Sequence, residues 1–182
     1  MRSLLVAGAV IAALATPAHA ADADPLDPLL RSAAERVATS DQVAAAKWEA
    51  DQPIDDPARE QQVLDSVARK SVQLGIGPEE SKRVFRDQIE ASKVVQRTLH
   101  AYWATHPDEQ PTERPDLGQL RPIIDRLGDE ILLELRDTEQ LREQPSCGVH
   151  LISAFQQTRS DLRLSGLHQA GLARAIPSIC TS

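Results

Sequence analysis

Two polar residues interrupt an otherwise apolar stripe that is typical of a helix packed inside a bundle. The stripe consists of Phe85, Ile89, Ser92, Gln96, Leu99 and Trp103. Successive members are four, three, four, three and four residues apart. This spacing places all six side chains on one helical face. A buried hydroxyl or amide without a hydrogen-bond partner costs about 1–3 kcal/mol. We therefore expect something polar, such as a small charged ligand, to meet Ser92 and Gln96 inside the bundle.

The first twenty residues have the pattern of a secretory signal peptide. Arg2 provides a positive start, residues 4–15 are apolar and rich in alanine, and Ala18-His19-Ala20 matches a cleavage site. The apolar run is shorter than the roughly 20 residues of a membrane helix, and no later stretch approaches that length. We expect cleavage after about Ala20 and a periplasmic or secreted chain without a membrane segment. A buried N-terminal helix is the alternative.

The two cysteines, Cys147 and Cys180, both follow the predicted cleavage site. The oxidising space outside the cytoplasm favours a disulfide between them. A loop of that length would stabilise the fold by roughly 3–4 kcal/mol in the chain-entropy model. Two free thiols are the alternative. A zinc site is disfavoured, because no histidine or further cysteine lies at ligand spacing from them.

The chain is acidic, with a formal net charge of −7. The predicted signal peptide carries one arginine and no acid, so the remaining chain is one unit more negative. Bulk attraction to nucleic acid is therefore not expected. An anionic ligand would have to be held by a few placed cations.

The composition predicts an all-α fold, a bundle of about six helices in one domain over residues 21–182. Strand-like alternation is absent and aromatic residues make up only 3%. The first predicted helix starts near residue 26 and either continues past residue 40 or restarts there behind Ser40 or Asp41. The second follows the cap Asp56 and stops at Gly75, and the third runs from Pro78 to about residue 104.

Residues 106–116 contain three prolines and are predicted to be a linker. A further helix is expected from 117 to about 142, with an inward seam of Leu and Ile residues. Another begins near Cys147 and breaks at Ser165-Gly166, and a last helix reaches Cys180. A disulfide would then join the last two helices as a hairpin.

Four cations stand out by their positions. Arg36 and Lys47 are eleven residues apart, which places them within about 20° of each other around a continuous helix. Arg59 lies on the apolar stripe of its predicted helix, and Arg121 lies beside the later Leu/Ile seam. Each of them alone is typical of a solvated surface cation. Together with Ser92 and Gln96 they indicate a site for an anion.

The pattern Arg36, Lys47, Asp56-x-x-Arg59-Glu60 and Ser92-x-x-x-Gln96 resembles that of the helical chorismate mutases. This resemblance covers about residues 29–103. The remainder, with Arg121, Cys147 and Cys180, looks like the exported subclass with its additional C-terminal helices. The resemblance implies an enzyme that converts chorismate to prephenate without a metal or an organic cofactor. It also implies a homodimer in which each pocket lies inside one protomer.

Roles follow from the resemblance position by position. Arg36 and Arg59 correspond to the carboxylate clamps, and Lys47 to the cation that faces the ether oxygen. Gln96 corresponds to the second donor to that oxygen, and Glu60 to the acceptor of the ring hydroxyl. Ser92 and the backbone near Asp56 would contact a carboxylate. Arg121 matches an arginine that shorter relatives take from the partner chain.

Other interpretations of the same residues are weaker. A non-catalytic exported bundle that binds an anionic metabolite or a partner protein is the main alternative function. Asp55 and Asp56 form a candidate acid pair, although a helix cap before Pro57 is the simpler explanation. No histidine near Ser92 supports a catalytic triad. Gly75-x-Gly77 is interpreted as a helix boundary, because no phosphate-binding loop pattern surrounds it.

Overall fold

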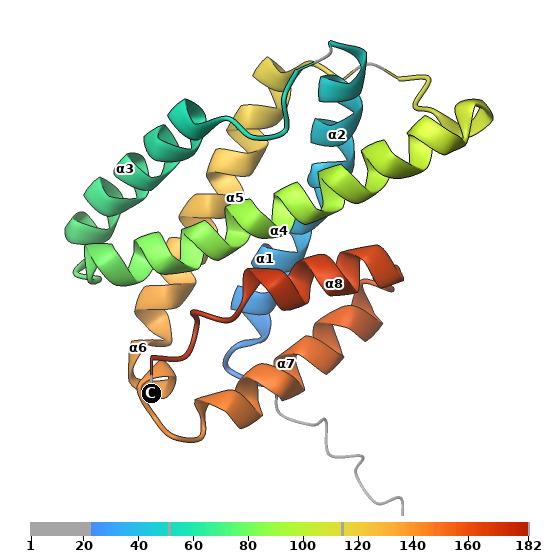
Figure 1. Cartoon of the computed structure of the whole chain (residues 1–182). Helices are drawn as coiled ribbons and strands as arrows, with labels where there is room; N and C mark the ends of the chain where they lie inside the picture. Colours follow the sequence, from blue (N-terminus) through green and yellow to red (C-terminus); the bar gives the residue numbers. More distant parts are fainter. Residues whose placement is uncertain (1–22, 51, 114, 182) are drawn as a thin grey trace, which may run out of the picture.

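The described residues of the computed structural model, 23–50, 52–113 and 115–181, contain helices and connecting segments and no strand, which confirms the all-α prediction (Figure 1). The predicted signal peptide lies outside these residues. No helix among them is long and apolar enough to cross a bilayer. The α-helices, of which α6 is a single turn, are α1 (Asp27–Ala38), α2 (Ser40–Glu49), α3 (Pro57–Leu74), α4 (Pro78–Thr105), α5 (Leu117–Asp137), α6 (Glu139–Arg142), α7 (Cys147–Asp161) and α8 (Gly166–Ala175).

The first helical segment is interrupted at a single residue. Thr39 separates α1 from α2, but its backbone dihedrals are still helical, and its hydroxyl donates to the carbonyl of Arg36 at 2.7 Å. A threonine hydroxyl that bonds back into the preceding turn bends a helix. Of the two alternatives for this segment, the restart near residue 40 is confirmed. The prediction that Ser40 or Asp41 caps the second helix is wrong, because Thr39 occupies the cap position and Ser40 is already the first helical residue.

Helices α3 and α4 pack side by side and begin and end as the sequence predicts. The Asp56 carboxylate accepts a hydrogen bond from the Arg59 amide at 3.0 Å, which caps α3 in front of Pro57. Gly75 ends α3 with φ of +79°, a conformation that glycine adopts without strain. Pro78 then starts α4, whose first turn carries two glutamates.

The predicted helix 117–142 is divided in the structure. Helix α5 ends at Asp137, and the single turn α6 follows after Thr138. The Thr138 hydroxyl donates to the Glu134 carbonyl at 2.6 Å, and this competition with the backbone explains the break. The predicted linker before α5 contains one short 3-10 turn, Pro107–Glu109.

The disulfide between Cys147 and Cys180 is confirmed. It joins the first residue of α7 to the segment after α8, as expected for a stapled C-terminal pair of helices. The prediction that the last helix reaches Cys180 is wrong, because α8 ends at Ala175. Pro177 explains the early end, because proline has no backbone N–H and cannot continue the hydrogen-bond ladder of the helix.

Helix α1 lies at the centre of the molecule. Its apolar residues are almost completely buried, and it contacts α4, α5, α7 and α8. The long α4 crosses the molecule and packs on α2, α3 and α8 (Figure 1). Residues of α1, α2, α3, α4 and α5 line a cavity between these helices. In α4 the predicted stripe faces inward: Phe85, Ile89, Gln96 and Trp103 are buried, and Ser92 and Leu99 are partly buried.

Candidate active site

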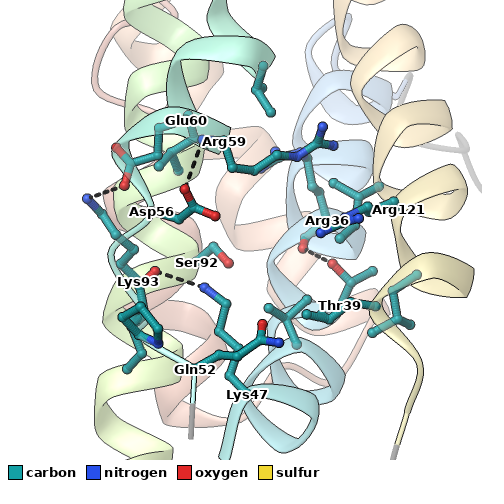
Figure 2. Close-up of a pocket in the computed structure, with 18 residues that line it drawn as sticks. Arg36, Thr39, Lys47, Gln52, Asp56, Arg59, Glu60, Ser92, Lys93 and Arg121 are labelled. Atoms are coloured by element: carbon teal, nitrogen blue, oxygen red, sulfur yellow. Dashed lines mark hydrogen bonds and ion pairs between the residues drawn. The ribbon is translucent and has the colours of Figure 1, made fainter. Parts of the chain in front are cut away.

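A cavity of about 250 Å³ lies between α1, α2, α3, α4 and α5. Figure 2 shows its lining. Seven of the eight site residues predicted from the sequence line it: Arg36, Lys47, Asp56, Arg59, Glu60, Ser92 and Arg121. They come from five helices, α1 to α5, and from the loop before α3. The structure thus brings together residues that are up to 85 positions apart in the sequence.

Arg36 is a buried cation that lines the cavity. Only 7% of the residue is exposed, and Nε has no hydrogen-bond partner among the described residues. Its guanidinium lies 5.8 Å from the ring centroid of Phe85. Burial lowers the pKa of Arg36 to about 10, partly offset by the negative charge of Asp125. A buried guanidinium without a full set of partners favours an anion in the cavity.

Arg59 and Arg121 extend the positive wall from two other helices. Arg59 reaches across the cavity from α3 towards α5, where its Nη2 lies 3.6 Å from the carboxylate of Asp125 (Figure 2). Arg121 projects from α5, close to Arg36 (Figure 2). Three guanidinium groups thus gather on one side of the cavity, and their planar forks suit carboxylate oxygens.

Lys47 enters the cavity from α2, opposite this cluster of arginines. Its Nζ donates to the carbonyl oxygen of Ile54 at 2.9 Å. Partial burial lowers the pKa of Lys47, although the negative charges of Asp56, Asp55 and Glu60 act in the opposite direction. The cation is therefore held in place by the loop that precedes α3.

The two carboxylates of the cavity have separate structural roles. Asp56 caps α3, so its oxygen is committed to the backbone. Glu60 accepts from Lys93 through one oxygen at 3.2 Å and faces Arg86 through the other at 3.4 Å. Asp55 does not line the cavity and pairs with Arg97 and Lys93. These contacts do not support Asp55 and Asp56 as an acid pair.

The two polar interruptions of the α4 stripe hydrogen-bond to each other. The Gln96 amide nitrogen donates to the Ser92 hydroxyl at 2.9 Å. The Ser40 hydroxyl donates to the same Ser92 hydroxyl at 2.8 Å. Gln96 is 4% exposed and does not line the cavity, so it stands one hydrogen bond behind Ser92. Its carbonyl oxygen has no partner among the described residues. The expectation that something polar meets these residues is thus met in part by Ser40.

Sequence reasoning missed one charged residue of the site, Lys93. It lines the cavity beside Ser92 although only 8% of it is exposed. Its position next to a polar interruption of the stripe, three residues after Glu90, was the available signal. The apolar walls were missed as site residues, although the seam of α5 was predicted to face inward. They include Val43, Val63, Ile89, Leu117, Leu120 and Ile124.

The arrangement suits the binding of a compact anion with more than one carboxylate. Five cations line the cavity against two carboxylates, in a chain whose net charge is −7. Apolar side chains close the rest of the wall, which lowers the local dielectric constant and strengthens each charge contact. Such a site can fold a flexible dianion into one conformation and stabilise charge that develops on it.

Known proteins with similar sequences and structures are chorismate mutases. The family model of chorismate mutase type II matches residues 27–97. The secreted chorismate mutase of Mycolicibacterium smegmatis is 36% identical over 96% of this chain and 97% of its own length. The secreted chorismate mutase of Mycobacterium tuberculosis is 34% identical over 94% of this chain and 86% of its own length. A crystal structure of chorismate mutase from Burkholderia phymatum superposes with a TM-score of 0.84 at 38% identity, covering 87% of this chain and 98% of its own. This chain therefore belongs to the chorismate mutase family.

Proposed function

We propose that this protein is an exported chorismate mutase, which rearranges chorismate to prephenate. The observation that carries the proposal is the convergence of Arg36, Lys47, Arg59, Ser92 and Arg121 on one cavity. A structural role for these residues would not require four cations from four helices to face a common space. Family membership supports the same reaction.

The reaction needs positioning and electrostatics more than reactive groups. It is a concerted [3,3] rearrangement in which one carbon–oxygen bond breaks while a carbon–carbon bond forms. No proton transfer or covalent intermediate is required. In our proposal Arg36, Arg59 and Arg121 hold the two carboxylates and the apolar walls hold the ring, so that the substrate stays in its reactive chair conformation.

Stabilisation of the charge that develops on the breaking ether oxygen is the second requirement. We propose that Lys47 and Gln96 donate to this oxygen. Lys47 is supported by its position opposite the arginines and its fixed hydrogen bond to Ile54. Gln96 lies behind Ser92 and gives one amide hydrogen to it, so a turn of its side chain towards the cavity would bring the second hydrogen to the substrate. Glu60 accepts from the ring hydroxyl, and Ser92 contacts a carboxylate.

Each active site is proposed to lie within one protomer. Arg121 supports this, because it reaches the cavity from α5 of the same chain. A homodimer and a single domain over residues 21–182 stay predictions. Light scattering of the purified chain would measure its mass and so check the homodimer.

Export is supported by the relatives, which are named secreted chorismate mutases. The Cys147–Cys180 disulfide is in keeping with an oxidising compartment. We propose cleavage after about Ala20. Amino-terminal sequencing of the protein recovered from the periplasm or the medium would test this.

The experiment that tests the function follows chorismate absorbance after the purified mature chain is added. We expect consumption of chorismate and formation of prephenate, identified by NMR, with no added metal or cofactor. Lys47→Ala is the matched negative control. A non-catalytic bundle would bind chorismate, detected by calorimetry, without consuming it. That outcome would overturn the proposed function.

A further inference from the structure

Lys93 lies at the centre of a cluster of three carboxylates at the edge of the cavity. Its ammonium is 2.6 Å from Glu90, 3.2 Å from Glu60 and 3.3 Å from Asp55. Glu90 belongs to the same helix, α4, whereas Glu60 belongs to α3 and Asp55 to the loop between α2 and α3. One buried cation therefore links three segments of the chain.

The first of these links fixes the acceptor of the active site. Lys93 donates to one oxygen of Glu60, and Figure 2 shows this contact at the edge of the cavity, across from the arginines. The Glu60 side chain is only 15% exposed. A buried carboxylate is costly without a partner. Lys93 thus orients Glu60 as an acceptor.

The second link anchors the loop that holds Lys47. Asp55 is held on α4 by Lys93 and by Arg97, whose Nη2 lies 2.7 and 2.9 Å from its two oxygens. The residue before it, Ile54, supplies the carbonyl that accepts from Lys47. The residue after it, Asp56, caps α3. Lys93 therefore holds in place the loop whose Ile54 carbonyl binds Lys47.

The charge state of Lys93 agrees with this arrangement. Burial alone would lower the pKa of its ammonium, but hydrogen bonds to Glu90, Glu60 and Asp55 outweigh burial, and the net shift is upward. The cluster thus holds one firmly charged cation. Without that cation, the three carboxylates would keep Arg97 at Asp55 and Arg86 at Glu60 but would lose the one charge that they share, and the like charges beside a site for a dianion would repel more strongly.

We propose that Lys93 is a positioning residue of the active site, which orients Glu60 and anchors the Asp55 loop so that the dianionic substrate can bind. This inference rests on the proposed function, since it assigns Lys93 a role through Glu60 and the loop.

The test compares steady-state kinetics with chorismate for two variants of Lys93. Lys93→Met keeps the length of the side chain and removes its charge, and Lys93→Arg keeps the charge. We expect Lys93→Met to raise KM tenfold or more with a smaller fall in kcat, and Lys93→Arg to recover most of the affinity. Lys82→Met, at a position of α4 whose ammonium pairs with Glu79 one turn away, is the matched control and should keep wild-type kinetics. Thermal unfolding of each variant reports on folding.

A second variant tests the role of the Asp55 loop in binding separately from any effect on folding. Asp55 is exposed, so Asp55→Asn should fold normally and raise KM by a smaller factor than Lys93→Met. The double variant should raise KM by less than the product of the single factors, because both changes remove the same contact. Wild-type KM in folded Lys93→Met, or in Asp55→Asn if Lys93→Met does not fold, would overturn the inference. An inactive wild-type protein would instead count against the proposed function.

Discussion

The Lys47 ammonium donates a hydrogen bond to the Ile54 carbonyl at 2.9 Å, so the loop before α3 holds the cation that we place at the ether oxygen. A donor that is fixed before the substrate arrives needs no reorganisation as charge develops. The same loop closes the cavity and caps α3 through Asp56. Positioning of the cation and closure of the site are thus properties of one segment.

Replacing Lys47 should therefore affect turnover more than binding. We expect Lys47→Ala to lower kcat by about 10²–10³-fold or more, with a much smaller change in KM, because its charge matters most in the transition state. Steady-state kinetics beside the control Lys82→Ala would measure this. A change in KM alone would show that Lys47 does not act on the ether oxygen.

Gln96 permits a prediction on pH dependence. An amide donates at every ordinary pH, so this residue gives the wild-type protein no acidic optimum. A glutamate at the same buried position must be protonated to donate, and burial raises the pKa of a carboxyl group. Gln96→Glu should therefore be active at low pH and lose kcat/KM as pH rises towards neutrality. Full activity of this variant at neutral pH, in a profile from pH 4.5 to 8, would contradict the role of Gln96.

Much of the fold and most of the candidate site could be predicted from the sequence, because local rules decide these features. The Asp56 cap, Gly75 and the α4 stripe each depend on residues a few positions apart. The break at Thr138 and the early end of α8 depend on a hydroxyl and a proline whose effects compete with helix propensity. Lys93 was missed because its partners come from three segments, and Gln96 lies behind Ser92 because Ser40 joins the same hydrogen-bond chain. Hydrogen-bond and ion-pair partners from distant segments of the chain depend on how the helices pack, which local sequence patterns do not specify.

The close approach of α8 to α1 and α4 makes Gly171 a test of that packing. A Cβ added at Gly171 would lie 2.7 Å from Val37 Cγ1 and 3.1 Å from Val95 Cγ2. We expect Gly171→Ala to destabilise the protein by about 1–3 kcal/mol through overpacking. Gly148→Ala is the matched control, since a Cβ there meets nothing within 4 Å and should stabilise α7 by roughly 0.5–1 kcal/mol. Urea unfolding would measure both, and equal effects of the two changes would contradict the close packing.

Glu134 makes stability depend on pH near neutrality. Its carboxyl lies between α5 and α1, where Ser32 donates to one oxygen at 2.9 Å and the other has no partner among the described residues. Burial raises the pKa of Glu134 to about 7, the Ser32 hydrogen bond lowers it, and the negative charges of Glu130, Glu35 and Asp137 raise it further. The folded protein therefore holds this proton more tightly than the unfolded chain does.

The sign of the effect follows from linkage. A raised pKa in the folded state contributes stability that is complete below the ordinary value of 4.5 and is lost as pH rises through about 7. Glu134→Gln removes this dependence, so it should be close to wild type at pH 5 and more stable at pH 8, by on the order of 1–2 kcal/mol after allowance for solvent screening. Ser32→Ala removes the bond that favours the charged form and should shift the loss of stability to higher pH. Denaturant unfolding at pH 5, 6, 7 and 8 would measure these differences. An equal gain in the free energy of unfolding from Glu134→Gln at pH 5 and pH 8 would show that Glu134 does not cause the pH dependence.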